Sequence, residues 1–192
     1  MSNRYPLDTT FTWETKADVF LQYAEVYKDC IQLILERYNE KPPFHDFSLA
    51  PVLFLFRQYI ELQLKGIIFF CTDVSPEEIK HHDIGTLYGI ALKAGEDRYG
   101  LEQAGEPNAD AERFIIALAK FDPSGQAFRY PETSKGESFS KKIERSDGWL
   151  YENLTDLHKL SNIITETIGD LEGIEGYLDM KYESEQEAFR NK

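Results

Sequence analysis

The sequence predicts an all-α protein, and three stretches carry that prediction. The first is residues 50–71, which are apolar almost all round and lack the alternation of a strand, so we expect a central, buried helix there. The other two are long stretches in which apolar residues recur every seven positions, as on one face of a packed helix. Their members are Trp13, Phe20, Tyr27 and Ile34, with Ala17, Ala24, Ile31 and Tyr38 beside them, and later Leu150, Leu157, Ile164, Leu171 and Leu178.

Composition limits the class of protein. The 192 residues suit a single domain, expected over 1–192 with its core at about 12–182. A net charge of -13 argues against broad affinity for nucleic acid or anionic membranes, but leaves room for a small basic patch. Residues 1–6 lack the apolar core of a signal peptide, and charges interrupt the longest apolar run, so no membrane span is expected. These two absences predict a cytoplasmic location. Cys30 and Cys71 each lie in an apolar helical pattern, so we expect buried free thiols, and they match no zinc spacing. We expect no metal and no cofactor.

Capping residues and prolines predict where the first two helices begin and end. Thr12 or Thr15 is expected to cap the first helix, which runs to about Asn39. The sequence Lys41-Pro-Pro stops that helix, because a proline disfavours helical geometry in the residue before it. Ser48 is the expected cap of the central helix.

Two shorter helices follow. Asp83 is expected to cap a third helix that runs to about Ala94, followed by a glycine-rich loop. Asn108 or Asp110 then opens a fourth helix, which runs to about Lys120.

The segment near 126–145 is expected to be a small extended or hairpin insertion. Residues 127–131 end in a proline and should be extended, and residues 138–144 form a second extended piece that pairs with them. This segment is locally basic, because its basic residues outnumber its acidic ones. The basic residues are Arg129, Lys135, Lys141, Lys142 and Arg145.

The last predicted helix begins between residues 149 and 153 and runs to about Tyr182. Gly169, Gly173 and Gly176 are expected either to permit close helix packing or to mark a kink or an end, because glycine disfavours a helix interior.

One polar stripe crosses the central helix and is the main candidate for function. Arg57, Glu61 and Lys65 are spaced at i, i+4 and i+8, which places them on one face. A charge on an otherwise apolar helix must be paired, hydrogen-bonded or solvated. Two interpretations remain open: a structural ladder of ion pairs, or a polar pocket in which the two cations hold a phosphate or carboxylate.

Two further segments are candidates. His82 is a possible general base near the stripe, while Asp83 has the simpler role of a helix cap. Arg129 lies between Phe128 and Tyr130, where it could stack on a base or bind a carboxylate; alternatively these aromatic residues anchor the segment on the core. The sequence contains no P-loop, dinucleotide fingerprint, GxSxG or HExxH motif.

These features together resemble the HEPN superfamily of bacterial helical bundles, over about residues 12–182. The resemblance implies an antiparallel four- or five-helix bundle that often dimerises. It also implies a role in toxin–antitoxin, phage-defence or stress systems, frequently on RNA. The residues that carry it are Arg57-x-x-x-Glu61-x-x-x-Lys65 on the central helix, the helix start His82-Asp83-Ile84 and the segment Phe128-Arg129-Tyr130-Pro131.

The sequence departs from the HEPN ribonucleases in one motif. Those enzymes carry an arginine a few residues before a histidine, whereas no histidine follows Arg113, Arg129 or Arg145 at that interval. The leading hypothesis is therefore a non-catalytic binding or regulatory module of a bacterial defence or stress system, binding RNA or a nucleotide. The alternatives are a metal-independent ribonuclease, with His82 and Glu61 as candidate catalytic residues, and a structural protein-interaction domain without a ligand.

The partner hypotheses follow from the same features. We expect a homodimer through the faces of the long helices, allow for a protein partner, and expect no membrane association. The predicted ligand-binding residues are Arg57, Glu61, Lys65, His82, Asp83, Arg129 and Tyr130.

Overall fold

The computed structural model describes residues 15–41, 49–75, 77–104, 108–130, 132, 136 and 138–191. Within them the chain forms seven α-helices, one short 3₁₀ helix (Leu101–Ala104) and no β-strand, which confirms the all-α prediction. None of the described helices is both long and apolar enough to cross a membrane. The helices are α1 (Lys16–Glu40), α2 (Leu49–Cys71), α3 (Ile84–Tyr99), α4 (Ala109–Phe121), α5 (Phe139–Glu144), α6 (Gly148–Thr155) and α7 (Leu157–Arg190).

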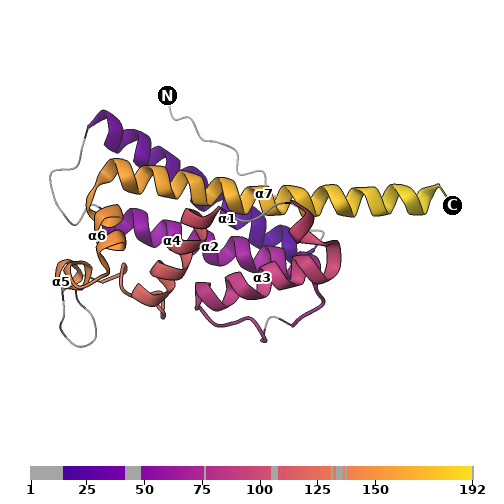
Figure 1. Cartoon of the computed structure of the whole chain (residues 1–192), viewed down its shortest axis with the longest axis horizontal. Helices are drawn as coiled ribbons and strands as arrows, with labels where there is room; N and C mark the ends of the chain where they lie inside the picture. The colour runs from indigo at the N-terminus through magenta and orange to yellow at the C-terminus, as the bar shows by residue number, and fades with distance from the viewer. Residues whose placement is uncertain are drawn as a thin grey trace, which may run out of the picture.

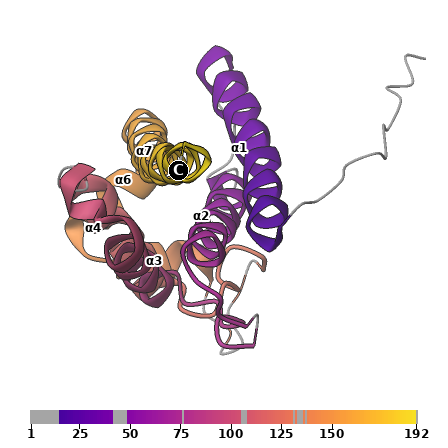
Figure 2. The ribbon, with the colours of Figure 1, turned by 90° about the vertical axis from the view of Figure 1, so that its right-hand side faces the viewer.

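Helix α2 is the centre of the bundle, as its apolar sequence predicts. Figure 2 shows α2 between α1 on one side and α3 on the other, with α7 alongside. Several of its large side chains, including Phe56, Ile60 and Leu64, are fully buried. The predicted cap Ser48 lies outside the described residues.

Helix α1 packs on α2 through the predicted seam. Thr15 is the cap: its hydroxyl oxygen accepts a hydrogen bond from the Asp18 backbone N–H at 3.2 Å. Ala24 and Ile31 are fully buried, whereas Trp13 and the alternative cap Thr12 lie outside the described residues. Glycine is required opposite this helix, because a Cβ at position 66 of α2 would lie 2.5 Å from a methyl carbon of Leu21.

The outer face of α1 carries three exposed large apolar side chains among polar and acidic ones. Tyr23, Val26 and Leu33 are 55%, 61% and 65% exposed. Cys30 lies on this face and is exposed, so the prediction of a buried thiol is wrong there, whereas Cys71 is buried as expected. The seven-residue seam places only one side of α1 against α2, and Cys30 falls on the other side.

Helices α3 and α4 begin at the predicted caps. The Asp83 carboxylate accepts from the backbone N–H groups of residues 85 and 86, and the Asn108 side chain caps α4. Helix α3 continues five residues past the predicted end at Ala94 and stops at Tyr99. It ends there because Gly100 adopts a left-handed conformation, with φ of 66°, which glycine accepts without strain.

Both predicted extended pieces are wrong: residues 127–130 form a turn, in which the Arg129 N–H donates to the Gln126 carbonyl at 3.1 Å, and residues 139–144 form the short helix α5. Ser138 caps α5 with its side chain, and Phe139 and Ile143, one turn apart, are both buried. Helical spacing places Phe139 against Phe121 and Phe128, with ring centroids at 6.3 and 5.6 Å. All that remains of a hairpin among the described residues is a single antiparallel bridge, from Glu132 to Ser138.

The last predicted helix is two helices, α6 and α7. Asp156 separates them, because its carboxylate accepts from the backbone N–H groups of His158 and Lys159 and starts a new helix. Helix α7 then runs to Arg190, beyond the predicted end at Tyr182, and its C-terminal end extends past the other helices (Figure 1). The three glycines 169, 173 and 176 neither end the helix nor provide close packing, since a Cβ there would meet open space.

Candidate functional site

The polar stripe of α2 is a buried ladder of ion pairs. Arg57, Glu61 and Lys65 are only 3%, 3% and 7% exposed. Arg57 Nη1 donates to Glu61 Oε2 at 3.2 Å, and Lys65 Nζ donates to Glu61 Oε1 at 2.9 Å. One carboxylate therefore accepts from the cations on both sides, as the i, i+4 and i+8 spacing predicts.

Arg57 also ties α2 to two other parts of the chain. Its Nε donates to the backbone carbonyl of Asp122 at 3.3 Å and lies 3.4 Å from Asp122 Oδ2, just after α4. Its Nη2 donates to the backbone carbonyl of His82, just before α3. The guanidinium thus joins the end of α4 to the start of α3 through the central helix.

The turn after α4 is shaped around this guanidinium. Asp122 Oδ1 accepts from the backbone N–H groups of Gln126 and Ala127, at 2.9 and 3.0 Å. Gly125 has φ of +71°, and a Cβ at this position would lie 2.8 Å from Arg57 Nη1. Only glycine satisfies both the conformation and the close approach. The sequence did not indicate that Asp122 and Gly125 belong to the site.

His82 joins the ladder from the surface. Its Nδ1 lies 2.8 Å from Glu61 Oε1, and its side chain is 59% exposed against 4% for Glu61. Burial raises the pKa of Glu61, but the hydrogen bonds and positive charges of Lys65 and His82 outweigh that effect, so the net pKa is lowered. Glu61 is therefore an ionised carboxylate that orients an exposed imidazole.

The geometry favours the structural interpretation of the ladder over the anion pocket. Arg57 and Lys65 direct their hydrogen bonds to Glu61 and to neighbouring backbone, and they have almost no exposed surface. A phosphate would have to displace Glu61 to reach them, which would leave a buried carboxylate unpaired. Of the four residues Arg57, Glu61, Lys65 and His82, only His82 has an exposed side chain.

The other predicted site residues lie apart from this network or have local roles. Asp83 is the cap of α3, and its hydrogen bonds from Thr86 and Gly85 outweigh the effect of burial and lower its pKa. The Arg129 guanidinium lies 5.2 Å from the Phe54 ring centroid. Tyr130 is 61% exposed and does not anchor the segment, whereas Phe128 is buried against Phe121, with ring centroids 5.5 Å apart.

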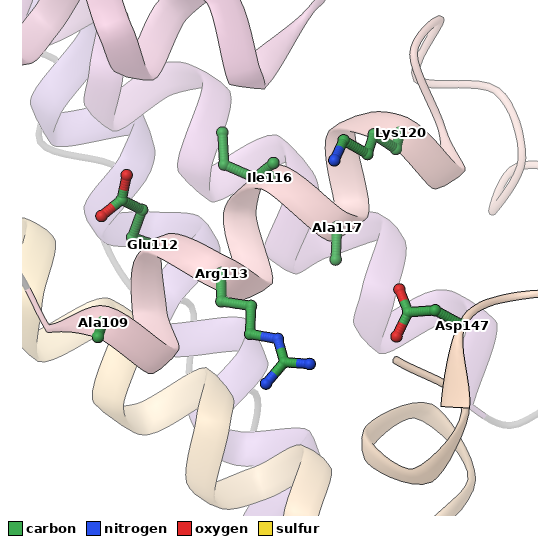
Figure 3. A pocket seen from close by; sticks show the side chains of 7 residues that line it. All are labelled: Ala109, Glu112, Arg113, Ile116, Ala117, Lys120 and Asp147. Carbon is green, nitrogen blue, oxygen red and sulfur yellow. The ribbon is translucent and has the colours of Figure 1, made fainter. Parts of the chain in front are cut away.

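A second site, which the sequence only partly indicated, runs along α4. Two neighbouring cavities, of about 330 and 270 Å³, share Ala117, Lys120 and Asp147 in their walls. Arg113 lines the first cavity, and Lys142 of α5 lines the second. Figure 3 shows Arg113 and Ala117 on α4, with Asp147 approaching from the segment before α6. We call this feature the α4 groove.

The cations of the α4 groove lie on aromatic rings instead of pairing with carboxylates. The Arg113 guanidinium lies 4.3 Å from the Trp149 ring centroid, and Lys142 Nζ lies 4.6 Å from that of Phe121. Neither cation, nor Lys120, forms an ion pair with any residue that the structure describes. The walls also carry Arg145, Glu112 and Asp147, so positive charge exceeds negative charge there.

Only part of this groove could be anticipated from the sequence. Lys142 and Arg145 belong to the segment predicted to be locally basic. Sequence reasoning missed Arg113 and Lys120 as a pair, although a spacing of seven residues places them on the same face of a helix. That spacing was the available signal, but it does not show that α5 and α6 lie opposite.

Metal ligation is not indicated in the described part of the chain, where no group of three or more His, Cys, Asp or Glu side chains could hold an ion. Comparisons with protein-family models, with curated proteins and with solved structures found no match. The resemblance to the HEPN superfamily therefore rests on the sequence motifs alone.

Proposed function

We propose that the chain is a HEPN-like, non-catalytic binding module of a bacterial defence or stress system that binds RNA or a nucleotide in the α4 groove. One observation supports this proposal: Arg113, Lys120 and Lys142 line adjoining cavities and have no acidic partner among the described residues. On a chain with a net charge of -13, such a group of cations is a local reversal of sign. Phosphate is the anion that such arginine and lysine side chains commonly bind.

The ligand site proposed here, the α4 groove, differs from the site that the sequence predicted. Arg57 and Lys65 are taken up by Glu61, so the proposed contacts come from α4 and α5 instead. The membership in a defence or stress system rests on the HEPN resemblance, which the fold accommodates as an all-α bundle.

Binding of a labelled oligouridylate or of ATP, measured by fluorescence anisotropy or calorimetry at low salt, tests this proposal. Lys120→Glu should abolish binding, because it reverses a charge within the groove. Lys93→Glu is the matched control, since it changes the net charge equally from an exposed position on α3. Equal loss in both variants would indicate a general charge effect and would contradict the proposed site. Absence of binding by the wild-type protein would favour the structural interaction domain.

A specific observation also favours the ribonuclease as a second candidate function. The exposed His82 imidazole is held by the buried Glu61 carboxylate, an arrangement that suits a general acid or base. Cleavage of RNA in the presence of a metal chelator, lost in His82→Ala but retained in His81→Ala, would support the ribonuclease. If wild type and His82→Ala leave RNA equally intact, the non-catalytic module is favoured.

We retain the homodimer as a proposal, but place it on a different surface. The two predicted seams are largely used within one chain, whereas Val26 and Leu33 on the outer face of α1 are 61% and 65% exposed. A second copy packed through this face would cover both side chains. Light scattering should then give a dimer for the wild type and a monomer for Leu33→Glu; a wild-type monomer would contradict the proposal.

A further inference from the structure

The α4 groove has two positively charged ends. Arg113 and Lys120 are seven residues apart on one helix, so their Cα atoms lie on the same side of α4 with about 10 Å between them along the axis. Ala117 lies between them and contributes only a methyl group to the shared wall. The groove therefore has a small apolar floor with a cation at each end.

The end at Arg113 offers a flat surface as well as a charge. The guanidinium lies over the Trp149 ring at 4.3 Å, and Trp149 in turn meets the ring of Phe114 edge-on at 6.1 Å. Arg113 is exposed, and the Trp149 ring lies on one side of its guanidinium. Bases stack on arginine planes as they do on aromatic rings.

The end at Lys120 carries further positive charge, because Lys142 and Arg145 also line the second cavity. Lys120 and Lys142 line the second cavity together, and Lys142 lies at the edge of the core against Phe121. Two ammonium groups suit a phosphate, which accepts hydrogen bonds from several directions.

With Arg113 lying on the Trp149 ring, we expect a ligand with a single phosphate to contact one of these ends at a time. Consecutive phosphates of a nucleic acid strand are separated by a sugar, and such a strand can present one phosphate to each end. A duplex is less favourable, because it would bring the additional phosphates of a second strand close to a chain of net charge -13.

We propose that the α4 groove binds single-stranded nucleic acid of at least two nucleotides, with one base stacked on the Arg113–Trp149 pair and successive phosphates at Arg113 and at Lys120 with Lys142. This inference rests on the proposed function, because it specifies the ligand of the same groove. It predicts that the affinity rises from one nucleotide to two, is lower for a duplex than for a single strand, and requires the cations at both ends of the groove.

Trp149 provides a direct signal for the test. The chain has two tryptophans, and Trp13→Phe leaves Trp149 as the only one, so tryptophan fluorescence then reports on Trp149 alone. In that background, emission is titrated with uridine monophosphate, 5′-phosphorylated diuridylate, hexauridylate, hexathymidylate and a twelve-base-pair duplex. The diuridylate should bind about tenfold more tightly than the monophosphate, the gain expected for one further charge-assisted contact. The two hexamers should bind alike, since no sugar hydroxyl is among the contacts, and the duplex should bind weakly.

The variants separate the two ends of the groove. Lys120→Ala and Arg113→Ala should each reduce diuridylate affinity to about that of the monophosphate, while Lys93→Ala should preserve the gain. Arg113→Lys keeps the positive charge but removes the planar guanidinium. This variant should therefore retain the phosphate contact, but ligand binding should no longer change the fluorescence of Trp149. The salt dependence should also fall by about 0.7 in log–log slope for each phosphate contact removed.

The failures are distinguishable. Equal affinity of the monophosphate and the diuridylate, or a duplex bound as tightly as a hexamer, would overturn this inference and leave the proposed function in place. A strand that binds only as RNA would overturn the proposed contacts, because none of them reaches the sugar hydroxyl. If no ligand binds the wild type, the proposed function fails as well.

Discussion

The ladder on α2 and the α4 groove both concentrate cations, but they use them in opposite ways. In the ladder, Arg57 and Lys65 are almost fully buried and share Glu61. In the groove, Arg113 and Lys120 are exposed and have no carboxylate partner among the described residues. Buried charges with internal partners determine the fold, whereas exposed charges without them remain available to a ligand. A charged stripe on a central helix is therefore a poor guide to a binding site.

The largest effect should come from Glu61→Ala. It leaves Arg57 and Lys65 facing each other in the interior, and removal of one member of a buried ion pair costs about 3–5 kcal/mol. Urea unfolding should show that loss for Glu61→Ala and a smaller one for Glu61→Gln, which keeps the volume and a hydrogen-bond acceptor. If Glu61→Ala unfolds at the wild-type midpoint, the ladder does not stabilise the fold and the contrast with the groove fails.

Gly125→Ala should produce the second-largest effect. Alanine at φ of +71° is strained, and its Cβ would lie 2.8 Å from Arg57 Nη1, so we expect a loss of about 1–3 kcal/mol. Gly136→Ala, at φ of +75° with open space around it, is the control for the conformational strain alone. The difference in unfolding free energy between the two variants then measures the contact with the guanidinium. Equal losses of unfolding free energy would mean that the close approach of residue 125 to Arg57 adds nothing to the conformational strain.

Glu175→Gln should have a smaller effect, with the opposite sign. Burial raises the pKa of Glu175, as do the charges of Asp179, Glu172 and Glu25, so ionised Glu175 destabilises the folded chain. The variant should therefore be more stable than wild type at neutral pH, and that advantage should shrink as the pH falls and wild-type Glu175 takes up its proton. Thermal unfolding at several pH values checks this, and a destabilised variant at neutral pH would contradict it.

The pKa of Glu61 is lowered, so its contribution to stability has the reverse pH dependence. That contribution is complete above the pKa of a glutamate in the unfolded chain and is lost as the pH falls through the lower folded-state value. Acid unfolding of the wild type against Glu61→Gln should show this difference.

Lys120→Ala and Lys142→Ala should have the smallest effect on stability. Neither cation pairs with a carboxylate among the described residues, and such substitutions usually change unfolding free energy by less than about 0.5 kcal/mol. Both variants should nevertheless lose affinity for an oligouridylate. A marked loss of stability in Lys120→Ala would show that the groove, like the ladder, has a structural role.

The sequence predicted the parts of this structure that depend on local patterns. The seams of α1 and α7, the apolar α2, and the caps Thr15, Asp83 and Asn108 all follow from spacing or from a short side chain before a helix. The spacing of Arg57, Glu61 and Lys65 likewise predicted their mutual pairing.

The sequence could not predict contacts between distant residues. Nothing local shows that Asp122 would reach Arg57, or that Trp149 would lie beneath Arg113. The errors have similar causes. A serine such as Ser138 is as common in turns as it is at the start of a helix. The helix is favoured here because Phe139 packs against Phe121 and Phe128, which are distant in the sequence. The break at Asp156 was hidden because the seven-residue repeat continues through it.

The ties made by Arg57 also have a consequence for the order of events during synthesis. Arg57, Glu61 and Lys65 leave the ribosome together on α2, and their mutual pairs need no later residue. The remaining partners arrive with His82 and then with the Asp122 turn, 65 residues after Arg57. Until that turn is made, the guanidinium keeps some of its water, and α2 cannot be fully enclosed. This stripe of α2 can thus close once the end of α4 has emerged, whereas the face of α2 that packs on α7 waits for a later segment, so a nascent chain halted before Asp122 should remain open along the stripe.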